Sequence, residues 1–298
     1  MAQGGRPLKP PRFSYQAPET TQQVVQLLED LGSDAKILAG GQSLVPLLSF
    51  RLARPKVILD INRVPGLDYV SSDGDTVRIG ALARHRDVEL HDEIRARCPM
   101  IADAMSVLGH VAIRNRGTVV GSLAHADPSA EWPALAVALD AECTLVSRSG
   151  SRTVPAGELF EGFMTTVIAP DEMLSETSFR LPPVGAGSAF FEVARRHGDF
   201  AQAGAGVVLA VEGDAVSYAR ISLLGLGSTP LRATAAEDRL LGERPSDDLF
   251  AEIAGLASNA MEPLDDVHAS AGYKRQVGTV MVRRALTTAR ARSGAGDG

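Results

Sequence analysis

Two loops rich in glycine and small residues are the parts of this sequence best suited to holding an anion. The first lies in "KILAGGQSL", where Gly40 and Gly41 stand side by side before Gln42 and Ser43. The second lies about eighty residues later in "GTVVGSLAHADPSAEWPAL", at 117–135. Backbone N–H groups and hydroxyls with no bulky neighbours can surround an anion from several sides. Each loop is therefore a candidate binding loop.

Neither loop fits the dinucleotide pattern GxGxxG or the phosphate-loop pattern GxxxxGK[ST]. For a single glycine pair, an ordinary tight turn is the alternative explanation. Two different small-residue loops instead suit a ligand with two phosphates that is held from two sides.

The elements that must position these loops alternate between strands and helices without a strict βαβ order, which favours an α+β fold. A helix capped by Thr20 or Thr21 is expected and should stop at Gly32, and Pro99 should separate two further helices. We expect one β-α-β-β region from the apolar runs "AKIL", "KVILDI" and "TVRIGAL". Further strands are expected at 143–147, about 171–183, 189–196, 203–213 and 216–227, the last three in one antiparallel sheet, and further helices at 132–141, 247–260 and 273 to about 292.

Composition narrows the possible partners. The formal net charge of −6 gives no reason to expect nucleic acid. Cys98 and Cys143 are the two cysteines of the sequence and are expected to be reduced and buried, so the chain cannot supply the ligands of an iron–sulfur cluster. No apolar run approaches the roughly 20 residues of a membrane span, and the N-terminus lacks a secretory signal. A cytoplasmic protein without an integral membrane segment is expected.

Three segments together resemble a known family. They are "AGGQSL" at 39–44, "IRNRGTVVGSLAHADPSAEWPAL" at 113–135 and "ARRHGDFAQAG" at 194–204. In this order and separation they closely resemble the FAD-binding medium subunit of the molybdenum hydroxylases, the xanthine oxidase and carbon monoxide dehydrogenase family. The resemblance implies a PCMH or vanillyl-alcohol-oxidase-type FAD-binding domain at 8–184, with lobes at about 8–65 and 66–184. A small carbon-monoxide-dehydrogenase-flavoprotein-like domain with an antiparallel sheet and helices would follow at 187–293.

The resemblance also implies which residues contact FAD. The first loop would wrap the pyrophosphate with backbone amides, so a Cβ at either glycine would hold the phosphate away. Glu131 would bind the adenosine ribose, and Leu174 would pack on the isoalloxazine. The implied FAD contacts are Leu38, Ala39, Gly40, Gly41, Gln42, Ser43, Leu44, Thr118, Val119, Val120, Gly121, Ser122, Ala124, His125, Glu131 and Leu174.

The segment "RRHGDFA" has two interpretations. By resemblance, Asp199 and Phe200 lie near the flavin, where an electron acceptor would arrive. A plain β-turn at 197–199 is the alternative.

Single residues in the second segment invite other chemistry. His125 is expected to line the flavin pocket, Asp127 to cap the turn before Pro128, and Trp132 to be a packing residue. His85, His91 and His110 share no metal-ligand spacing, so no metal site is predicted.

The sequence departs from the family at one position of the second loop. The family usually has Thr-x-Gly-Gly there, whereas this chain has Thr118-Val119-Val120-Gly121. Because a β-branched residue rarely adopts positive φ, we expect either extended backbone at Val120 or a shifted loop.

The implied function is that of an oxidoreductase subunit. Substrate would be hydroxylated at a molybdopterin cofactor on a large subunit, and electrons would pass through [2Fe–2S] clusters on a small subunit to FAD on this chain. FAD would then reduce an external acceptor, in an assembly expected to be a dimer of heterotrimers. Two alternatives are a free-standing flavin oxidase of the same fold and an assembly subunit without cofactor.

Overall fold

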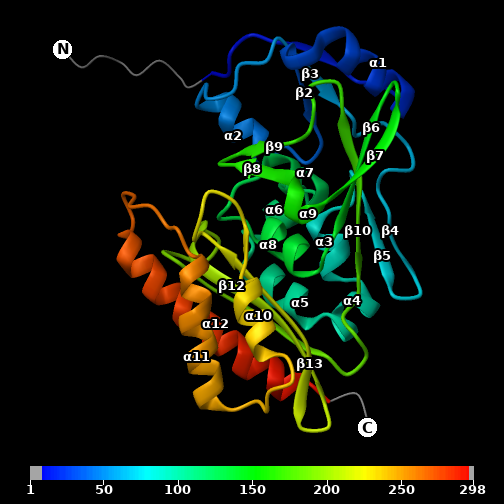
Figure 1. Cartoon of the computed structure of the whole chain (residues 1–298). Coiled ribbons are helices and arrows are strands. Elements are labelled where there is room, and N and C mark those ends of the chain that lie inside the picture. Colours follow the sequence, from blue (N-terminus) through cyan, green and yellow to red (C-terminus); the bar gives the residue numbers. More distant parts are fainter. Residues whose placement is uncertain (1–8, 295–298) are drawn as a thin grey trace, which may run out of the picture.

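The structure, a computed structural model, describes residues 9–294 and contains three larger sheets with flanking helices (Figure 1). Residues 1–8 and 295–298 lie outside the described part, so the N-terminal end of the predicted first domain is not covered. Within 9–294, no helix is both long and apolar enough to cross a membrane.

The first lobe is a parallel three-stranded sheet in the order β1-β3-β2. The helix α1 begins after Thr20, whose side chain accepts a hydrogen bond from the N–H of Gln23, and it ends at Gly32 with φ +52°. Because β2 and β3 run parallel, their carboxyl ends meet at one edge, and the first loop leaves β2 there. The elements are β1 (Ser14–Gln16), α1 (Thr21–Leu31), η1 (Gly32–Asp34), β2 (Ala35–Leu38), α2 (Leu44–Ser49) and β3 (Val57–Asp60).

The second lobe is built on an antiparallel sheet in the order β4-β5-β10-β6-β7. The expected β-α-β-β region is wrong in one respect, because the "TVRIGAL" strand, β5, pairs with β4 and β10 and not with the first sheet. The strands are β4 (Val70–Asp73), β5 (Thr76–Gly80), β6 (Glu142–Ser147), β7 (Gly150–Pro155) and β10 (Met173–Arg180).

Short helices and one small hairpin fill the space beside this sheet. Pro99 begins α5 directly after α4 ends, as predicted. The helix expected at 132–141 occupies Glu131–Ala138. The elements are α3 (His85–Glu89), α4 (Asp92–Arg97), α5 (Pro99–Val107), α6 (Val111–Arg114), α7 (Val119–His125), α8 (Glu131–Ala138), α9 (Ala156–Leu159), β8 (Phe160–Gly162) and β9 (Thr165–Thr166).

The third unit is an antiparallel sheet in the order β11-β12-β13-β14, followed by three helices. The sequence predicted β11 to β13 and the last two helices, whereas β14 and α10 were not predicted. On the last helix, Met281 and Leu286 are buried, whereas Val280 is 43% exposed. The elements are β11 (Gly187–Ala194), β12 (Ala201–Glu212), β13 (Ala215–Leu224), β14 (Leu231–Arg232), α10 (Thr234–Leu240), α11 (Asp247–Ala257), η2 (Ser258–Ala260) and α12 (Ala271–Arg292).

The last sheet joins the two parts of the molecule. One face carries Ala205, Val207 and Ile221 into a core shared with the C-terminal helices. From the other face, Phe190 and Val208 pack into the core of the first two lobes. Figure 1 shows α11 and α12 beside β12, with α5 and α8 beyond the sheet. The connection between β11 and β12 is therefore held in a fixed position relative to the second loop.

Candidate functional site

The first loop presents a run of backbone donors that the protein does not use. Within residues 9–294, the N–H groups of Gly40 to Leu44 donate to no protein acceptor. Gly41 adopts φ +72°, and such a left-handed residue in a turn lets successive N–H groups converge on one point. Gln42 is exposed and its neighbours are half-buried, so the donors are accessible. The loop is therefore suited to binding an anion through backbone N–H groups alone, without a lysine or arginine in the loop.

Gly40 is also where the two loops touch. A Cβ at this position would lie 2.3 Å from the carbonyl oxygen of Arg116 and 2.7 Å from Cα of Gly117. Both neighbours are backbone atoms and cannot rotate away as the end of a side chain can. Close contact with the second loop therefore requires a glycine at position 40, whether or not a phosphate also approaches this residue.

Two polar side chains fasten the loops together. Asn62, which follows β3, donates to the carbonyl of Ala39 over 2.8 Å. Arg84 donates to the side-chain oxygen of Asn62 over 2.8 Å and to the carbonyl of Arg116 over 2.7 Å. Burial lowers the pKa of Arg84 from its ordinary value, yet the guanidinium remains the cationic centre of the network. The network fixes the separation of the loops before any ligand binds.

The second loop is the start of α7, which corrects the expectation for Val120. Val120 is helical and 3% exposed, so the backbone there is neither extended nor left-handed. Thr118 caps the helix by accepting from the N–H of Gly121 over 3.1 Å. Within the described part of the chain, the N–H of Val120 has no protein acceptor. A valine is tolerated because the position needs only helical φ and an apolar environment.

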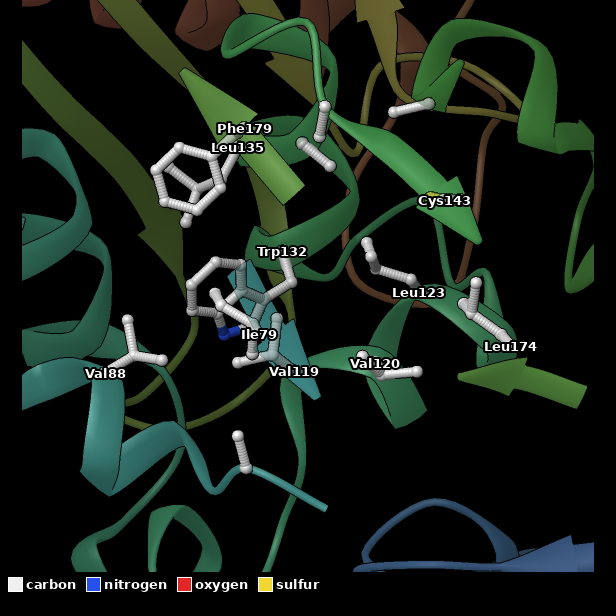
Figure 2. Close-up of a cluster of buried hydrophobic side chains, with 14 of the residues drawn as sticks. Ile79, Val88, Val119, Val120, Leu123, Trp132, Leu135, Cys143, Leu174 and Phe179 are labelled. Atoms are coloured by element: carbon white, nitrogen blue, oxygen red, sulfur yellow. The ribbon is translucent and has the colours of Figure 1, made fainter. Parts of the chain in front are cut away.

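Figure 2 shows how this helix is packed. Val119, Val120 and Leu123 point into a packed cluster that also contains Trp132, Ile79 and Phe179. The opposite face of α7, with Gly121, Ser122, Ala124 and His125, remains accessible. Small residues therefore line the side of α7 that can receive a ligand.

Asp127 and Trp132 of the second segment have the roles predicted from the sequence, and two nearby histidines are wholly or partly buried. Asp127 accepts from the N–H of Ser129 over 2.9 Å, which confirms the turn cap. Trp132 is 2% exposed, which confirms packing, and it stacks on the ring of His85 with 6.2 Å between centroids. Burial lowers the pKa of His85 to about 3, so this ring is neutral beneath Gly117 of the second loop. Burial also lowers the pKa of His125 from its ordinary value.

The remaining predicted contacts lie in two different environments. Leu174 is 5% exposed, and in Figure 2 it lies beside Val120 and Leu123 in the core. Its side chain is thus directed into protein. Glu131 is 8% exposed at the start of α8, and burial raises the pKa of its carboxyl to about 7.

The "RRHGDFA" segment forms the connection between β11 and β12. Asp199 donates its N–H to the carbonyl of Arg196 over 3.1 Å, and Gly198 has φ +84°, so a turn is present. His197 lies 5.8 Å from His110, between ring centroids, and Phe200 is 66% exposed. The predicted β-turn is therefore present. It is compatible with a position of Asp199 and Phe200 near the flavin, which stays a prediction.

Asn62 and Arg84 were not predicted from the sequence. Asn62 could have been found because it directly follows a strand parallel to the one that precedes the first loop. Arg84 has no comparable local signal. A cleft of about 420 Å³ opens beside them, lined by Asn62, Arg63, Val64, Pro65, Asp68, Leu82, Arg84 and Asp87.

The unused N–H groups of the first loop, set against the start of α7 on a two-lobed α+β domain, are typical of a protein that binds an anionic group through its backbone. Comparisons with known proteins give the family. Residues 11–183 match the FAD binding domain in molybdopterin dehydrogenase, and residues 188–289 match the CO dehydrogenase flavoprotein C-terminal domain.

The chain is similar to these proteins over nearly its whole length. It is 43% identical to the 6-hydroxypseudooxynicotine dehydrogenase complex subunit alpha of Paenarthrobacter nicotinovorans, over 95% of this chain and 96% of that protein. It is 39% identical to the carbon monoxide dehydrogenase medium chain of Hydrogenophaga pseudoflava, over 95% and 99%. A solved carbon monoxide dehydrogenase chain from Hydrogenophaga pseudoflava superposes with a TM-score of 0.93 at 40% identity, covering 95% of this chain and 99% of that one.

This chain belongs to the FAD-binding medium subunits of the molybdenum hydroxylases. The predicted family, the α+β fold with a two-part FAD-binding domain, and FAD as the cofactor are confirmed.

Proposed function

We propose that this chain is the electron-exit subunit of a molybdenum hydroxylase. FAD on this chain would receive electrons from [2Fe–2S] clusters of a small partner subunit and reduce an external acceptor. The observation that carries the proposal is the run of unused N–H groups from Gly40 to Leu44, set against the second loop by the Arg84 network. When bound, FAD supplies the two-electron redox chemistry.

Different residues suit different parts of FAD. The N–H groups of Gly40 to Leu44 and of Val120 suit the pyrophosphate, with Thr118 orienting the start of α7. Small residues on the accessible face of α7 allow the cofactor to approach the backbone. The exposed Phe200 and neighbouring Asp199 suit the edge of the site where electrons leave, since they project from a turn packed beside His110.

The proposed partners are a large molybdopterin subunit and a small iron–sulfur subunit, in a cytoplasmic dimer of heterotrimers. Support comes from the relatives, which are named as medium chains or as subunits of dehydrogenase complexes. It also comes from the cysteines, because the sequence has two and both are buried, whereas such clusters take thiolate ligands. The free-standing oxidase is disfavoured because both faces of the β11–β14 sheet are packed, one against helices and one against the FAD domain.

An affinity-tagged copy of this chain, purified from its own host, tests the proposal. We expect FAD to co-purify with this chain, and iron and molybdenum to be found in two associated chains. Rapid mixing with the substrate of the complex should reduce the clusters before the flavin. A flavin-containing chain that purifies alone and oxidises an organic substrate would contradict the proposal, and a colourless chain that binds no FAD in any assembly would favour the assembly subunit.

A further inference from the structure

Gly117, the first residue of the second loop, is in close contact with two other parts of the molecule. One is Gly40 of the first loop, whose added Cβ would lie 2.7 Å from Cα of Gly117. The other is the ring of His85, because a Cβ on Gly117 would lie 2.8 Å from both Cδ2 and Nε2 of this imidazole. Gly117 does not have positive φ, so its backbone conformation alone would accept an alanine. The neighbouring atoms therefore require a glycine at this position.

The backbone of Gly117 is also paired with the segment that carries His85. The N–H of His85 donates to the carbonyl of Gly117 over 3.0 Å. An isolated antiparallel bridge joins the preceding residue, Arg84, to Thr118. This pairing holds the backbone of His85 beside the second loop, so that only the orientation of its ring remains to be fixed.

The core fixes the ring of His85. The ring stacks on Trp132 with 6.2 Å between ring centroids and 12° between the ring planes. Trp132 is 2% exposed, and Figure 2 shows it in the packed cluster that also holds Val119. His85 is itself 5% exposed, so its ring has little space in which to rotate. A chain of contacts thus leads from the core through Trp132, His85 and Gly117 to the first loop.

The ring of His85 acts on Gly117 through contact and not through charge. Burial and the nearby positive charges of Arg114 and Arg84 lower its pKa to about 3, so the imidazole is neutral. Within residues 9–294, its Nδ1 is buried without a hydrogen-bond partner. Because such an unsatisfied atom does not stabilise the fold, an apolar side chain of similar size should be able to replace the imidazole.

We propose that His85 is a positioning residue for FAD binding: its ring, supported by Trp132, holds Gly117 against Gly40 and thereby sets the gap between the first loop and the start of α7. The inference rests on the proposed function, in which these two segments hold the pyrophosphate. The unused N–H groups of the first loop begin at Gly40, and the unused N–H of Val120 lies three residues after Gly117. A shift of Gly117 therefore separates donors that must reach one ligand, and FAD affinity falls even where the fold persists.

The experiment uses the purified complex that contains the tagged chain, from which FAD has been removed. FAD is titrated by flavin fluorescence, and the midpoint of thermal unfolding is recorded for the same samples without FAD. Gly117→Ala and His85→Ala should each raise the dissociation constant by about tenfold or more, the first by overpacking and the second by leaving a space beside the loop. In the double variant the new methyl group occupies part of this space, so the constant should rise by much less than the product of the two single effects.

His85→Leu is the conservative variant, because its two Cδ atoms can keep the contact with Gly117 without a ring nitrogen. It should bind FAD within about threefold of wild type. Two matched controls should behave as wild type. His268→Ala removes an exposed imidazole from the C-terminal domain, and Gly157→Ala adds a Cβ that meets nothing within 4 Å.

Several results would overturn the inference. A folded Gly117→Ala or His85→Ala complex with wild-type affinity does so, even if its unfolding midpoint is lower, and either variant suffices if the other does not fold. Single effects that multiply in the double variant would show that the two residues act independently. An affinity of His85→Leu as low as that of His85→Ala would mean that the imidazole is needed for a hydrogen bond. Failure of wild type to bind FAD would instead overturn the proposed function, which is distinguishable because no variant would then differ from wild type in affinity.

Discussion

Gly40→Ala is the substitution that most directly tests whether the two loops form one site. The added Cβ would lie 2.3 Å from the carbonyl oxygen of Arg116 and 2.7 Å from Cα of Gly117. Real Cβ contacts are longer than this, so one loop must move. Because Asn62 and Arg84 tie both loops together, the movement also strains three hydrogen bonds of 2.7–2.8 Å.

The expected cost follows from overpacking. Forcing an additional methyl group into a packed contact costs about 1–3 kcal/mol. If about 2 kcal/mol is needed to restore the loop separation that FAD requires, the dissociation constant rises by roughly 30-fold. If instead the loops stay in place, the same cost appears as a lower free energy of unfolding.

The assay measures both quantities. FAD is titrated into the FAD-free complex by flavin fluorescence, and the midpoint of thermal unfolding is recorded for the same sample. Gly157→Ala is the control, because a Cβ there meets nothing within 4 Å and the position lies in the same domain. A Gly40→Ala complex with wild-type affinity and wild-type unfolding midpoint would refute the view that the loops are in direct contact.

Three further predictions follow from burial and charge. Cys98 and Cys143, whose pKa values burial raises to about 12 and about 11, should resist a thiol reagent at pH 8 in the native chain and react fully in denaturant. Asp140→Asn should lower the free energy of unfolding by about 1 kcal/mol, since the half-exposed Asp140 joins the FAD domain to two arginines of the C-terminal domain. These arginines lower the pKa of Asp140. The contribution of Asp140 to the free energy of unfolding is therefore complete above the ordinary carboxyl pKa and declines as pH falls through the lowered value. This part of the pH dependence should be absent from the acid unfolding curve of the variant. Val120→Gly should lower the free energy of unfolding by about 3 kcal/mol, measured with denaturant, and leave FAD affinity nearly unchanged, since only the N–H of residue 120 faces the site.

Local signals in the sequence were sufficient for most elements and for the two loops. The helix cap, predicted at Thr20 or Thr21 and found at Thr20, depends on neighbouring residues alone, as do the stop at Gly32 and the break at Pro99, which occur where expected. The glycine pair likewise indicated an unusual backbone conformation, and Gly41 has φ +72°, which is rare in other residues. The family resemblance supplied the cofactor, which spacing alone did not identify.

Partners distant in sequence could not be predicted in the same way. The assignment of β5 to the first region failed because an apolar strand carries no mark of the sheet it will join, and its partners β4 and β10 lie on either side of it in the chain. Arg84 was missed for a similar reason, since its role depends on Asn62 and Arg116, which only the folded chain brings together.

Val120 shows how a true pattern can lead to a wrong structural expectation. A second glycine in the family's loop suggested a left-handed residue, and a valine at that place then suggested a distorted loop. In the structure the position is the second residue of α7 and 3% exposed, so its side chain packs in the core while its N–H points out of the helix end. A helix N-terminus needs donors and helical φ at this place, and both glycine and valine provide them. The side chain at position 120 therefore affects the stability of the lobe, whereas its backbone N–H, without an acceptor in residues 9–294, is left for the contact with FAD that we propose.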